Sequence, residues 1–599
     1  LTAPHQRTLM KASVLGRSFT PGAIRAIYPP GHDATAVPDH LHELARHDLT
    51  PLEDAAAGTY AFKHVITQDV VYKNLGEAER RAAHERAGAW IEQTDPDNAP
   101  LLAYHYGRGD NLDKRRLYLR RAAEAAQAAS ANEAAITGYT GLADLLEPAD
   151  RLTVMLQLGA IWQLVGKWAE AEAIFGEALA TAESLGDARA VAEAQMGLGN
   201  VQRERGTLAP AATYLEQART GFAHIGDREG LLQVAGFLGR VYWMQDNRPQ
   251  ALALFREQLH LAQDLGNRQG TGRALVNLGI VYNEMREVDE ALSHLEGGLA
   301  LAVELGDRAG QQRAYWGLAS LVHGRREYAR ALDYYTHTMN IAQEIGDRRA
   351  THVALSGMGY VYLDYGDYTR ALACIAHQLS SALALGDLGG ITPGIGNIAI
   401  MYAHQGWEAL AERLMRATVT MARTLDTPYL LAVYLFRTAE LRYQQGQYAA
   451  AAAANAEAAR LAVQVEDQEF TFNTTVLAVA LRLQLGELTP AAARAACTTL
   501  LAEWPSPTQQ AEILYTRWRL DPRQADARDA AAAAYRNLYA SAPTYILRDR
   551  YEELTGERLP DPPALPDLPA IVTRQVVDLP ALLTQVESLV ESLAAGSLP

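Results

Sequence analysis

Residues 347–386 read DRRATHVALSGMGYVYLDYGDYTRALACIAHQLSSALALG, and this stretch decides the fold. Two runs of apolar residues at helical spacing lie on either side of Gly366 and Asp367. Asp347 suits the N-cap of the first helix, because its carboxylate can accept hydrogen bonds from the free amides of a first turn. Gly386 suits the end of the second helix. The stretch therefore predicts two helices of about five turns each, at a rise of 1.5 Å per residue.

The same unit recurs along the chain with a period of 40 residues. Leu-Gly-Asp or a close variant ends six successive units, from Leu185 to Asp387. An alanine marks the second helix and a small residue marks the first, at Ala171, Ala211, Ala251, Ala291, Ala331, Ala371, Ala411, Ala451 and Ala491, and at Gly159, Gly199, Gly239, Gly279, Ala319, Gly359, Ala399 and Ala439. Three marks in one register predict an array of helix pairs over residues 151–490, in which neighbouring pairs supply the core.

The repeat resembles a known family. Gly239-x-x-Tyr242 followed by Ala251-x-x-x-Phe255 is similar to the tetratricopeptide repeat, in the longer variety of bacterial regulators and kinesin light chain-like proteins. The resemblance implies an all-α fold, a right-handed superhelical tetratricopeptide solenoid. It implies little about function, because one fold hosts many functions.

Composition restricts the function classes. The chain has 54 basic and 70 acidic residues, a net charge of −16, which argues against nucleic-acid binding through the array and against binding to anionic membranes. Cys374 and Cys497 are the two cysteines, too few for a disulfide framework or a zinc site, and they favour a reducing cytoplasm. No run of 18 apolar residues occurs, so we expect no membrane span.

Catalytic motifs are missing from the sequence. It contains no Gly-x-x-x-x-Gly-Lys-Ser/Thr, no His-Glu-x-x-His, no Cys-x-x-Cys and no Gly-x-Ser-x-Gly. Gly394-x-Gly396-x-x-Ala399 matches a dinucleotide-binding pattern, but it follows no predicted strand and Ala399 occupies the small position of a repeat. We therefore expect no enzyme activity, no cofactor and no metal in these 599 residues.

Residues 1–92 lie outside the repeat register. Three short helical patterns and a hairpin pattern around residues 49–62 predict a small winged-helix module. The strings at residues 12–19, 62–66 and 80–84 resemble the segment that follows the ATPase core of bacterial STAND-type regulators, many of them adenylate/guanylate cyclase-like or transcriptional proteins. Because the chain opens at Leu1, we expect a C-terminal fragment that begins after the ATPase, with ATP or ADP bound by the missing part.

His64 has a sharper expectation. Phe62-Lys63-His64-Val65-Ile66 is similar to a motif of STAND proteins, and the resemblance implies that His64 senses ADP at the start of a helix. The other interpretation is a histidine that caps or packs locally. Both stay open at this point.

The resemblance implies that the first helix of each pair lines the concave side of the array. Aromatic residues and arginine there are typical of binding hot spots, and the arginines favour an acidic or carboxylate-bearing peptide. The alternative is a solvated face with packing aromatics. The predicted groove residues are Asn200, Arg203, Arg240, Trp243, Arg273, Asn283, Arg313, Trp316, His323 and Tyr360. By contrast, the strict period of Arg228, Arg268, Arg308 and Arg348 predicts structural bridges between neighbouring units.

The remaining segments complete the predicted domains. Residues 93–150 are expected to form an irregular helical cap, residues 491–556 capping helices that include one over 530–539 behind Asp529, and residues 557–599 a proline-rich linker with a final helix over 579–595. That helix could fold back on the array or bind another chain.

The functional prediction is the sensor region of a cytoplasmic STAND-type ATPase regulator. A protein, peptide or small ligand in the groove would control the upstream ATPase and its effector, which are the expected partners. The alternative is a stand-alone scaffold without a nucleotide switch.

Overall fold

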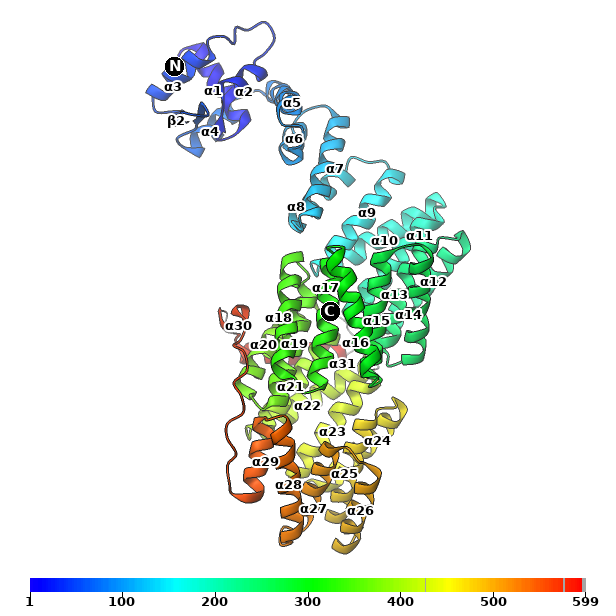
Figure 1. Cartoon of the computed structure of the whole chain (residues 1–599). Coiled ribbons are helices and arrows are strands. Elements are labelled where there is room, and N and C mark those ends of the chain that lie inside the picture. The colour runs from blue at the N-terminus through cyan, green and yellow to red at the C-terminus, as the bar shows by residue number, and fades with distance from the viewer. Residues whose placement is uncertain (426, 575–576, 595–599) are drawn as a thin grey trace. The chain divides into compact units, whose positions relative to one another are not determined.

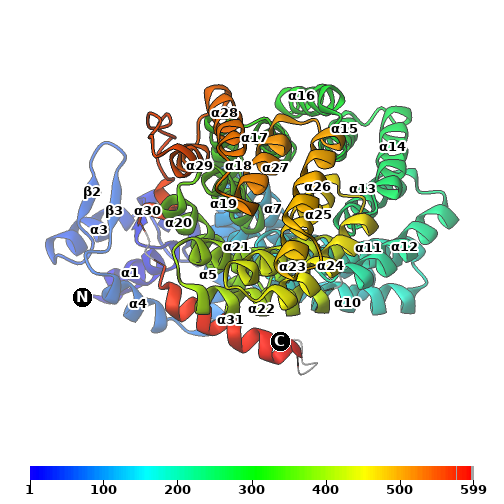
Figure 2. The ribbon, with the colours of Figure 1, turned by 90° about the horizontal axis from the view of Figure 1, so that it is seen from below.

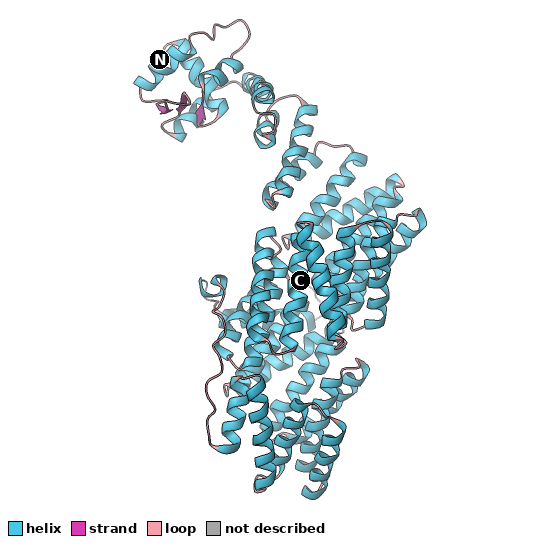
Figure 3. Cartoon of the chain, viewed as in Figure 1, coloured by secondary structure: helices cyan, strands magenta, loops and turns pink. Residues whose placement is uncertain are grey.

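The computed structural model describes residues 1–425, 427–574 and 577–594 (Figure 1). It divides into two compact units, Leu1–Ile161 and Trp162–Pro599. Within the described ranges, strands occur only near the N-terminus and the other regular elements are helices (Figure 3). This confirms the predicted all-α class.

The first unit opens with short helices around a three-stranded antiparallel sheet of order β1-β3-β2. Its elements are α1 (Ala3–Leu15), β1 (Ser18–Phe19), α2 (Pro21–Ile27), α3 (Val37–Arg46), β2 (Leu52–Asp54), β3 (Thr59–Ala61), α4 (Val65–Lys73) and α5 (Glu77–Thr94). The three helices and the hairpin follow in the predicted order. The strand β1, which pairs Ser18 with Ala61, was not expected, and β2 begins at Leu52 instead of Leu49. The assignment as a winged helix stays a prediction.

Further helices complete this unit and lead into the array: α6 (Ala99–Tyr106), α7 (Leu112–Ala128), α8 (Asn132–Ala143) and α9 (Pro148–Leu164). The domain boundaries predicted at residues 92 and 150 stay predictions.

The second unit is built from consecutive helix pairs that pack as a tetratricopeptide-type solenoid (Figure 1). It begins with α10 (Trp168–Leu185). The pairs that follow are α11 (Ala188–Arg205) with α12 (Leu208–Ile225), α13 (Arg228–Met244) with α14 (Arg248–Asp264), α15 (Arg268–Glu284) with α16 (Val288–Glu304), α17 (Arg308–Gly324) with α18 (Tyr328–Ile345), α19 (Arg348–Tyr365) with α20 (Tyr368–Leu385), α21 (Leu388–His404) with α22 (Glu408–Thr424), and α23 (Pro428–Gln444) with α24 (Tyr448–Gln464). The helix α25 (Gln468–Gln484) comes after the last of these pairs.

The small residue of the first helix lies where the two helices of a pair approach closely. A Cβ added to Gly279 of α15 would lie 2.7 Å from Leu295 Cγ and 3.0 Å from the Ala291 carbonyl of α16. The predicted caps are present as well. Asp347 accepts a hydrogen bond from the Ala350 amide at 2.9 Å, and Gly386 ends α20 with a positive φ of 69°.

The periodic arginines close single pairs instead of joining neighbouring units. Arg228 at the start of α13 lies 2.7 Å from Asp264 at the end of α14, its own partner helix. Arg268 reaches Glu304 in the same way at 2.7 Å, and Arg308 pairs with Glu344. The prediction of bridges between units is therefore wrong for these three arginines, because the start of the first helix and the end of the second meet at one edge of the pair.

Successive turns of the superhelix touch along a seam. Arg286, just after α15, pairs with Glu469 of α25 at 2.8 Å across 183 residues of sequence. Arg248 donates to the Val465 carbonyl at 3.2 Å in the same manner. At Gly206, a Cβ would lie 2.9 Å from the Gly389 amide nitrogen. The loop after a first helix thus meets the start of a first helix one turn further along.

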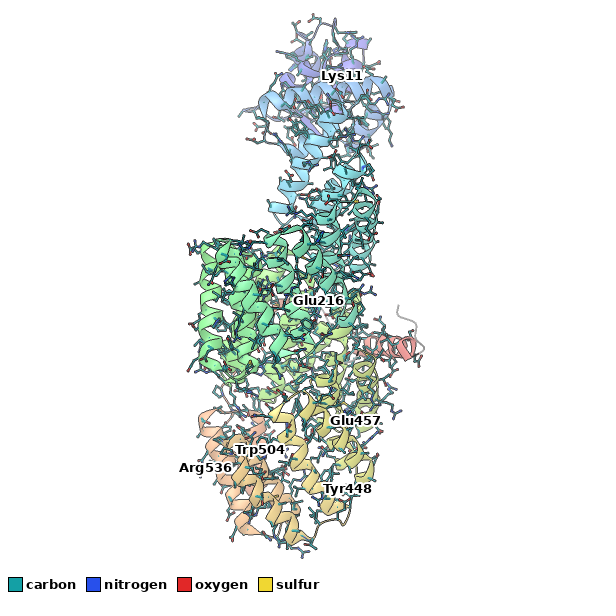
Figure 4. The ribbon with its side chains drawn as sticks, turned by 90° about the vertical axis from the view of Figure 1, so that its right-hand side faces the viewer. Lys11, Glu216, Tyr448, Glu457, Trp504 and Arg536 are labelled. Atoms are coloured by element: carbon teal, nitrogen blue, oxygen red, sulfur yellow. The ribbon has the colours of Figure 1, made fainter. Side chains whose placement is uncertain are left out.

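Four helices extend the array, namely α26 (Pro490–Glu503), α27 (Pro507–Leu520), α28 (Ala525–Ser541) and α29 (Tyr545–Thr555). The helix predicted over 530–539 begins earlier, at Ala525 after the N-cap Gln524, so the capping role predicted for Asp529 is wrong. Asp529 instead pairs with the adjacent Arg528. Figure 4 labels Arg536 of α28, and also Glu457 of the earlier helix α24, which pairs with Arg423 of α22 at 2.8 Å.

The C-terminal segment folds back on the array. The sequence had left open whether its final helix does so or binds another chain. Residues 557–569 form neither helix nor strand, and they lead to α30 (Ala570–Arg574) and α31 (Leu579–Ala594). The helix α31 packs against α22 and α20, and α30 packs against α20. The sequence predicted a final helix over 579–595, and residue 595 lies outside the described residues.

Candidate ligand-binding face of the array

The first helices share one interior. Each contacts the first helices before and after it, as α15 contacts both α13 and α17. Glu204 at the end of α11 lies 2.8 Å from Arg349 of α19, although α19 begins four pairs further along. Such a contact requires the first helices to curve around a common inner face. The predicted concave positions lie on these helices.

Five arginines gather on this inner face, and we call them the inner arginine cluster. They come from five successive first helices, and the charge of each one acts on at least one other. The members are Arg203, Arg240, Arg273, Arg313 and Arg349.

Three members of the cluster have carboxylate partners. Arg203 is buried and ion-paired with Glu204, and it also donates to the predicted site residue Asn200 at 2.8 and 2.9 Å. Arg273 lies 3.3 Å from Asp307, and Arg349 lies 2.8 Å from Glu204. The Arg203–Asn200 contact is internal, so neither residue is presented freely to a ligand.

Arg240 and Arg313 differ from the other three. Neither has an ion pair with any described residue, and the Nε atom of Arg240 is buried without a hydrogen-bond partner. Burial, with Arg203 and Arg313 nearby, holds the pKa of Arg240 well below its ordinary value. Burial and Arg273 lower the pKa of Arg313 to about 10. Glu204 acts on Arg240, and Asp307 and Asp347 act on Arg313, but these carboxylates only partly offset the burial and the neighbouring arginines. Because a guanidinium stays protonated in proteins, the two positive charges favour an anion.

Two predicted tryptophans lie next to these arginines on the same helices. The rings of Trp243 and Trp316 meet edge to face, with centroids 6.1 Å apart and planes at 80°. The Nε1 atom of Trp243 is buried and makes no hydrogen bond of good geometry. The aromatic pair beside Arg240 and Arg313 provides apolar contact area, and the Trp243 donor acts on Glu284.

Toward the C-terminal ends of α13 and α15, the inner face carries acidic residues instead of arginines. Glu284 keeps 36% of its side-chain exposure, yet protein surrounds it closely enough to raise its pKa to about 7. Burial raises the pKa of Asp246 to about 6. The Trp243 donor and Arg248, which lies 3.8 Å from Glu284, only partly offset the effect of burial on the pKa of Glu284. The inner face is thus positive at the arginine cluster and acidic next to Trp243.

The other predicted groove residues lie on the same first helices but bind within the protein. His323 lies 3.0 Å from Asp364, and Asn283 donates to Ser320 at 3.3 Å. The hydroxyl of Tyr360 lies among polar groups, and burial raises its pKa. These contacts join neighbouring pairs and leave Arg240, Arg313, Trp243 and Trp316 as the residues available to a ligand.

Some inner-face residues were missed by the sequence interpretation. Asp387, an N-cap, binds His352 at 2.8 Å, and both are 1% exposed. Although burial acts to raise it, Arg349 and His352 hold the pKa of Asp387 below its ordinary value. The repeat register marked Asp387 only as a cap, and Arg349 has no equivalent at most repeats, so no periodic signal pointed to them.

His64 lies in the first unit, where it is the residue before α4, as predicted. Its side chain is exposed and makes no capping hydrogen bond. The alternative of a capping or packed histidine is therefore not supported, and the nucleotide-sensing role stays a prediction.

A cavity of about 240 Å³ lies on the outer side of the array, away from these residues. It is lined mainly by α12 and α14, including Glu216, which Figure 4 labels, and Arg219, which pairs with Glu257 at 3.0 Å. None of the predicted site residues lines it.

Over the described ranges, no group of three or more His, Cys, Asp or Glu residues is placed to hold a metal ion. No described helix combines the length and apolar character needed to cross a bilayer.

Residues 150–223 and 230–303 match the family described as tetratricopeptide repeat. No curated protein sequence matches the chain. Among solved structures, the chain is similar to a Signal Transduction ATPase with Numerous Domains (STAND) protein with a tetratricopeptide repeat sensor from Pyrococcus horikoshii, at 15% identity and a TM-score of 0.38, over 80% of this chain and 66% of that one. The chain thus spans just under two thirds of that protein's length.

The chain is also similar to a Rap protein complexed with Competence and Sporulation Factor, at 14% identity and a TM-score of 0.46, over 59% of this chain and 99% of that one. The apo form of the quorum sensor NprR from B. thuringiensis is similar at 15% identity and a TM-score of 0.36, over 53% and 98%. Residues 150–303 therefore carry tetratricopeptide repeats, and they open an array that continues as a tetratricopeptide-type solenoid.

Proposed function

We propose that the array is a non-catalytic recognition region whose inner face binds an acidic or carboxylate-bearing peptide. The observation that carries this proposal is the pair Arg240 and Arg313, which are enclosed, positively charged and form no ion pair with a described residue. An uncompensated charge in such surroundings is costly, and a bound carboxylate removes the cost through charge-assisted hydrogen bonds.

Trp243 and Trp316 add an apolar contact beside the anion site. A ligand that is only a small anion would leave these rings unused, whereas a peptide with an apolar residue next to its carboxylate engages both features. The acidic residues near Trp243 disfavour a chain of many carboxylates, so the preferred peptide carries its negative charge at one end.

The test uses a synthetic random hexapeptide library with free carboxyl termini and the same library with amidated termini. Each is incubated with the purified full chain, separated by gel filtration, and the retained peptides are sequenced by mass spectrometry. The wild type should retain peptides with a free or side-chain carboxylate, and Arg313→Gln should reduce retention by about tenfold.

The matched control is Arg256→Gln on the outer helix α14, which removes an exposed arginine that donates to Tyr282 at 3.1 Å. This variant should retain the same peptides as the wild type. Equal retention of free and amidated peptides, or retention that survives both Arg240→Gln and Arg313→Gln, would overturn the proposed function.

We also propose that this region controls a STAND-type ATPase joined upstream. The support is the resemblance of the strings in residues 1–92 together with the exposed position of His64 at the start of α4. A longer chain that includes the ATPase should bind ADP, and His64→Ala should weaken that binding. A longer chain that binds no nucleotide would contradict this part and leave peptide recognition untouched.

A further inference from the structure

The helix α31 binds the array through one apolar stripe. Leu582, Leu583, Val586 and Leu593 are buried, with Val586 fully inaccessible. Gln585 and Ser588 on the other side of the helix are exposed. The spacing places the four buried residues on one face of a helix.

The surface beneath α31 is formed by second helices of the array, on the side away from the inner arginine cluster. Figure 2 shows α31 lying along α22, and α31 contacts α22 and α20. Its buried residues join one hydrophobic cluster that includes Leu379 of α20 and Leu414 of α22. Glu587 of α31 lies 2.7 Å from Arg413 of α22, so a charge contact fixes the helix beside the apolar one. We call this surface of α20 and α22 the helix seat.

The connection to the seat is a tether without regular structure. The Tyr362 hydroxyl donates to the Pro566 carbonyl at 2.8 Å, and Arg370 donates to the Leu565 carbonyl at 3.2 Å. These bonds hold carbonyl groups of a proline-rich segment, and residues 557–569 belong to no helix or strand. The array therefore holds α31 as a tethered ligand instead of as a member of a helix pair.

We propose that the helix seat is a second binding site, which takes an amphipathic helix from a partner protein, and that α31 is its built-in competitor. The partner helix needs aliphatic residues at the spacing of Leu582, Leu583 and Val586 and a carboxylate that meets Arg413. Besides its four buried side chains, α31 contributes Leu579, Leu589 and Val590, which are only partly buried, and one exposed ion pair. The tether holds α31 at an effective concentration on the order of 1 mM, and a partner helix with a better fit displaces it.

The test uses the full chain and a fluorescent peptide of residues 577–594, VDLPALLTQVESLVESLA. Val586→Asp in the chain places a charge in the fully buried position and unseats α31, whereas Gln585→Asp changes the exposed neighbour. The Val586→Asp chain should bind the peptide, and the wild-type and Gln585→Asp chains should bind it at least about tenfold more weakly, because their own helix fills the seat.

Charge reversal identifies the seat. Arg413→Glu, added to the Val586→Asp chain, should weaken binding of the peptide, and a Glu587→Arg peptide should restore it. A peptide with Val586→Asp should bind none of the chains. Equal binding by the wild type and the Val586→Asp chain, or binding by neither, would overturn the proposal.

Two further measurements test whether α31 leaves the helix seat and whether a second copy of the chain occupies it. In hydrogen exchange, α31 of the wild type should exchange faster than α22, and equally slow exchange would show that α31 does not leave its seat. A concentration-dependent dimer of the wild type that Val586→Asp abolishes would assign the seat to α31 of a second copy and overturn the proposed partner. The inner-face arginines take no part in these experiments, so their outcome is independent of the peptide-retention test.

Discussion

At the scale of single residues, the array contains arginines of two kinds that sequence position does not distinguish. Arg203 is buried against Asn200 and Glu204, whereas Arg240 and Arg313 form no ion pair with a described residue and lie close to other arginines. An arginine of the first kind stabilises the fold, whereas an arginine of the second kind lowers its stability. Substitutions of the two kinds should therefore change stability in opposite directions.

Arg240→Gln should raise the melting temperature of the ligand-free chain, with a gain on the order of 1 kcal/mol, because it removes an uncompensated charge. Arg203→Gln is the comparison, and it should destabilise the chain by about 2 kcal/mol, because it removes one of the two arginines that pair with Glu204 and the donor to Asn200. Scanning calorimetry in peptide-free buffer measures both. A lower melting temperature for Arg240→Gln would contradict the assignment of a free charge.

Asp246 provides a pH-dependent prediction. Burial raises its pKa from 3.8 to about 6, so the folded chain holds this proton more tightly than the unfolded chain does. Its contribution to stability is complete below pH 3.8 and is lost as the pH rises through about 6. The melting temperature of the wild type should fall over this range, and Asp246→Asn should reduce the fall. The exposed Glu408→Gln serves as the control, and an unchanged pH profile in Asp246→Asn would contradict the shift.

At the scale of elements, each helix pair depends on one point of close approach. A Cβ on Gly359 of α19 would lie 2.5 Å from Ile375 Cγ1 of α20, whereas a Cβ on Gly176 of α10 meets open space. Both glycines lie inside helices, so the substitution to alanine separates packing from helix propensity.

Gly359→Ala should lower the free energy of unfolding by about 1–3 kcal/mol through overpacking. Gly176→Ala should raise it by up to about 1 kcal/mol, because alanine is the better helix former. Circular dichroism melts compare the two variants with the wild type. A Gly359→Ala chain as stable as the wild type would mean that the pair adjusts its spacing freely.

The helix pairs could be predicted from the sequence because their caps, small residues and apolar stripes are local and periodic. Which inner arginines are free could not be predicted, because it depends on Glu204 and Asp307, whose distances to the arginines follow from the curvature of the array. The position of α31 could not be predicted either, because an amphipathic sequence shows that the helix needs an apolar surface but not which surface of the protein it packs against. The helix predicted behind Asp529 began too late, since an aspartate inside a first turn resembles a cap in sequence.

At the scale of the whole array, the seam joins turns that the sequence separates by about 180 residues, as in the pair Arg286 and Glu469. Gly206 and Gly186 allow a matched test of this seam, because both end a helix with positive φ, at 82° and 69°. A Cβ on Gly206 meets the backbone of Gly389, whereas one on Gly186 meets nothing within 4 Å.

Gly206→Leu should push adjacent turns apart and increase the radius of gyration measured by small-angle X-ray scattering. Gly186→Leu has a similar left-handed strain of about 1 kcal/mol or more but should leave the radius unchanged. An equal response of both variants would show that the seam does not limit the extension of the array.

The seam also constrains how such an array can change by duplication. A solenoid whose units contact only their neighbours gains or loses a unit without disturbing the rest. Here an inserted pair between α17 and α25 would move Glu469 away from Arg286 and bring a different loop to face it. The copy number of the repeats is therefore part of the fold of this protein, and a viable change in length would have to add or remove a complete turn.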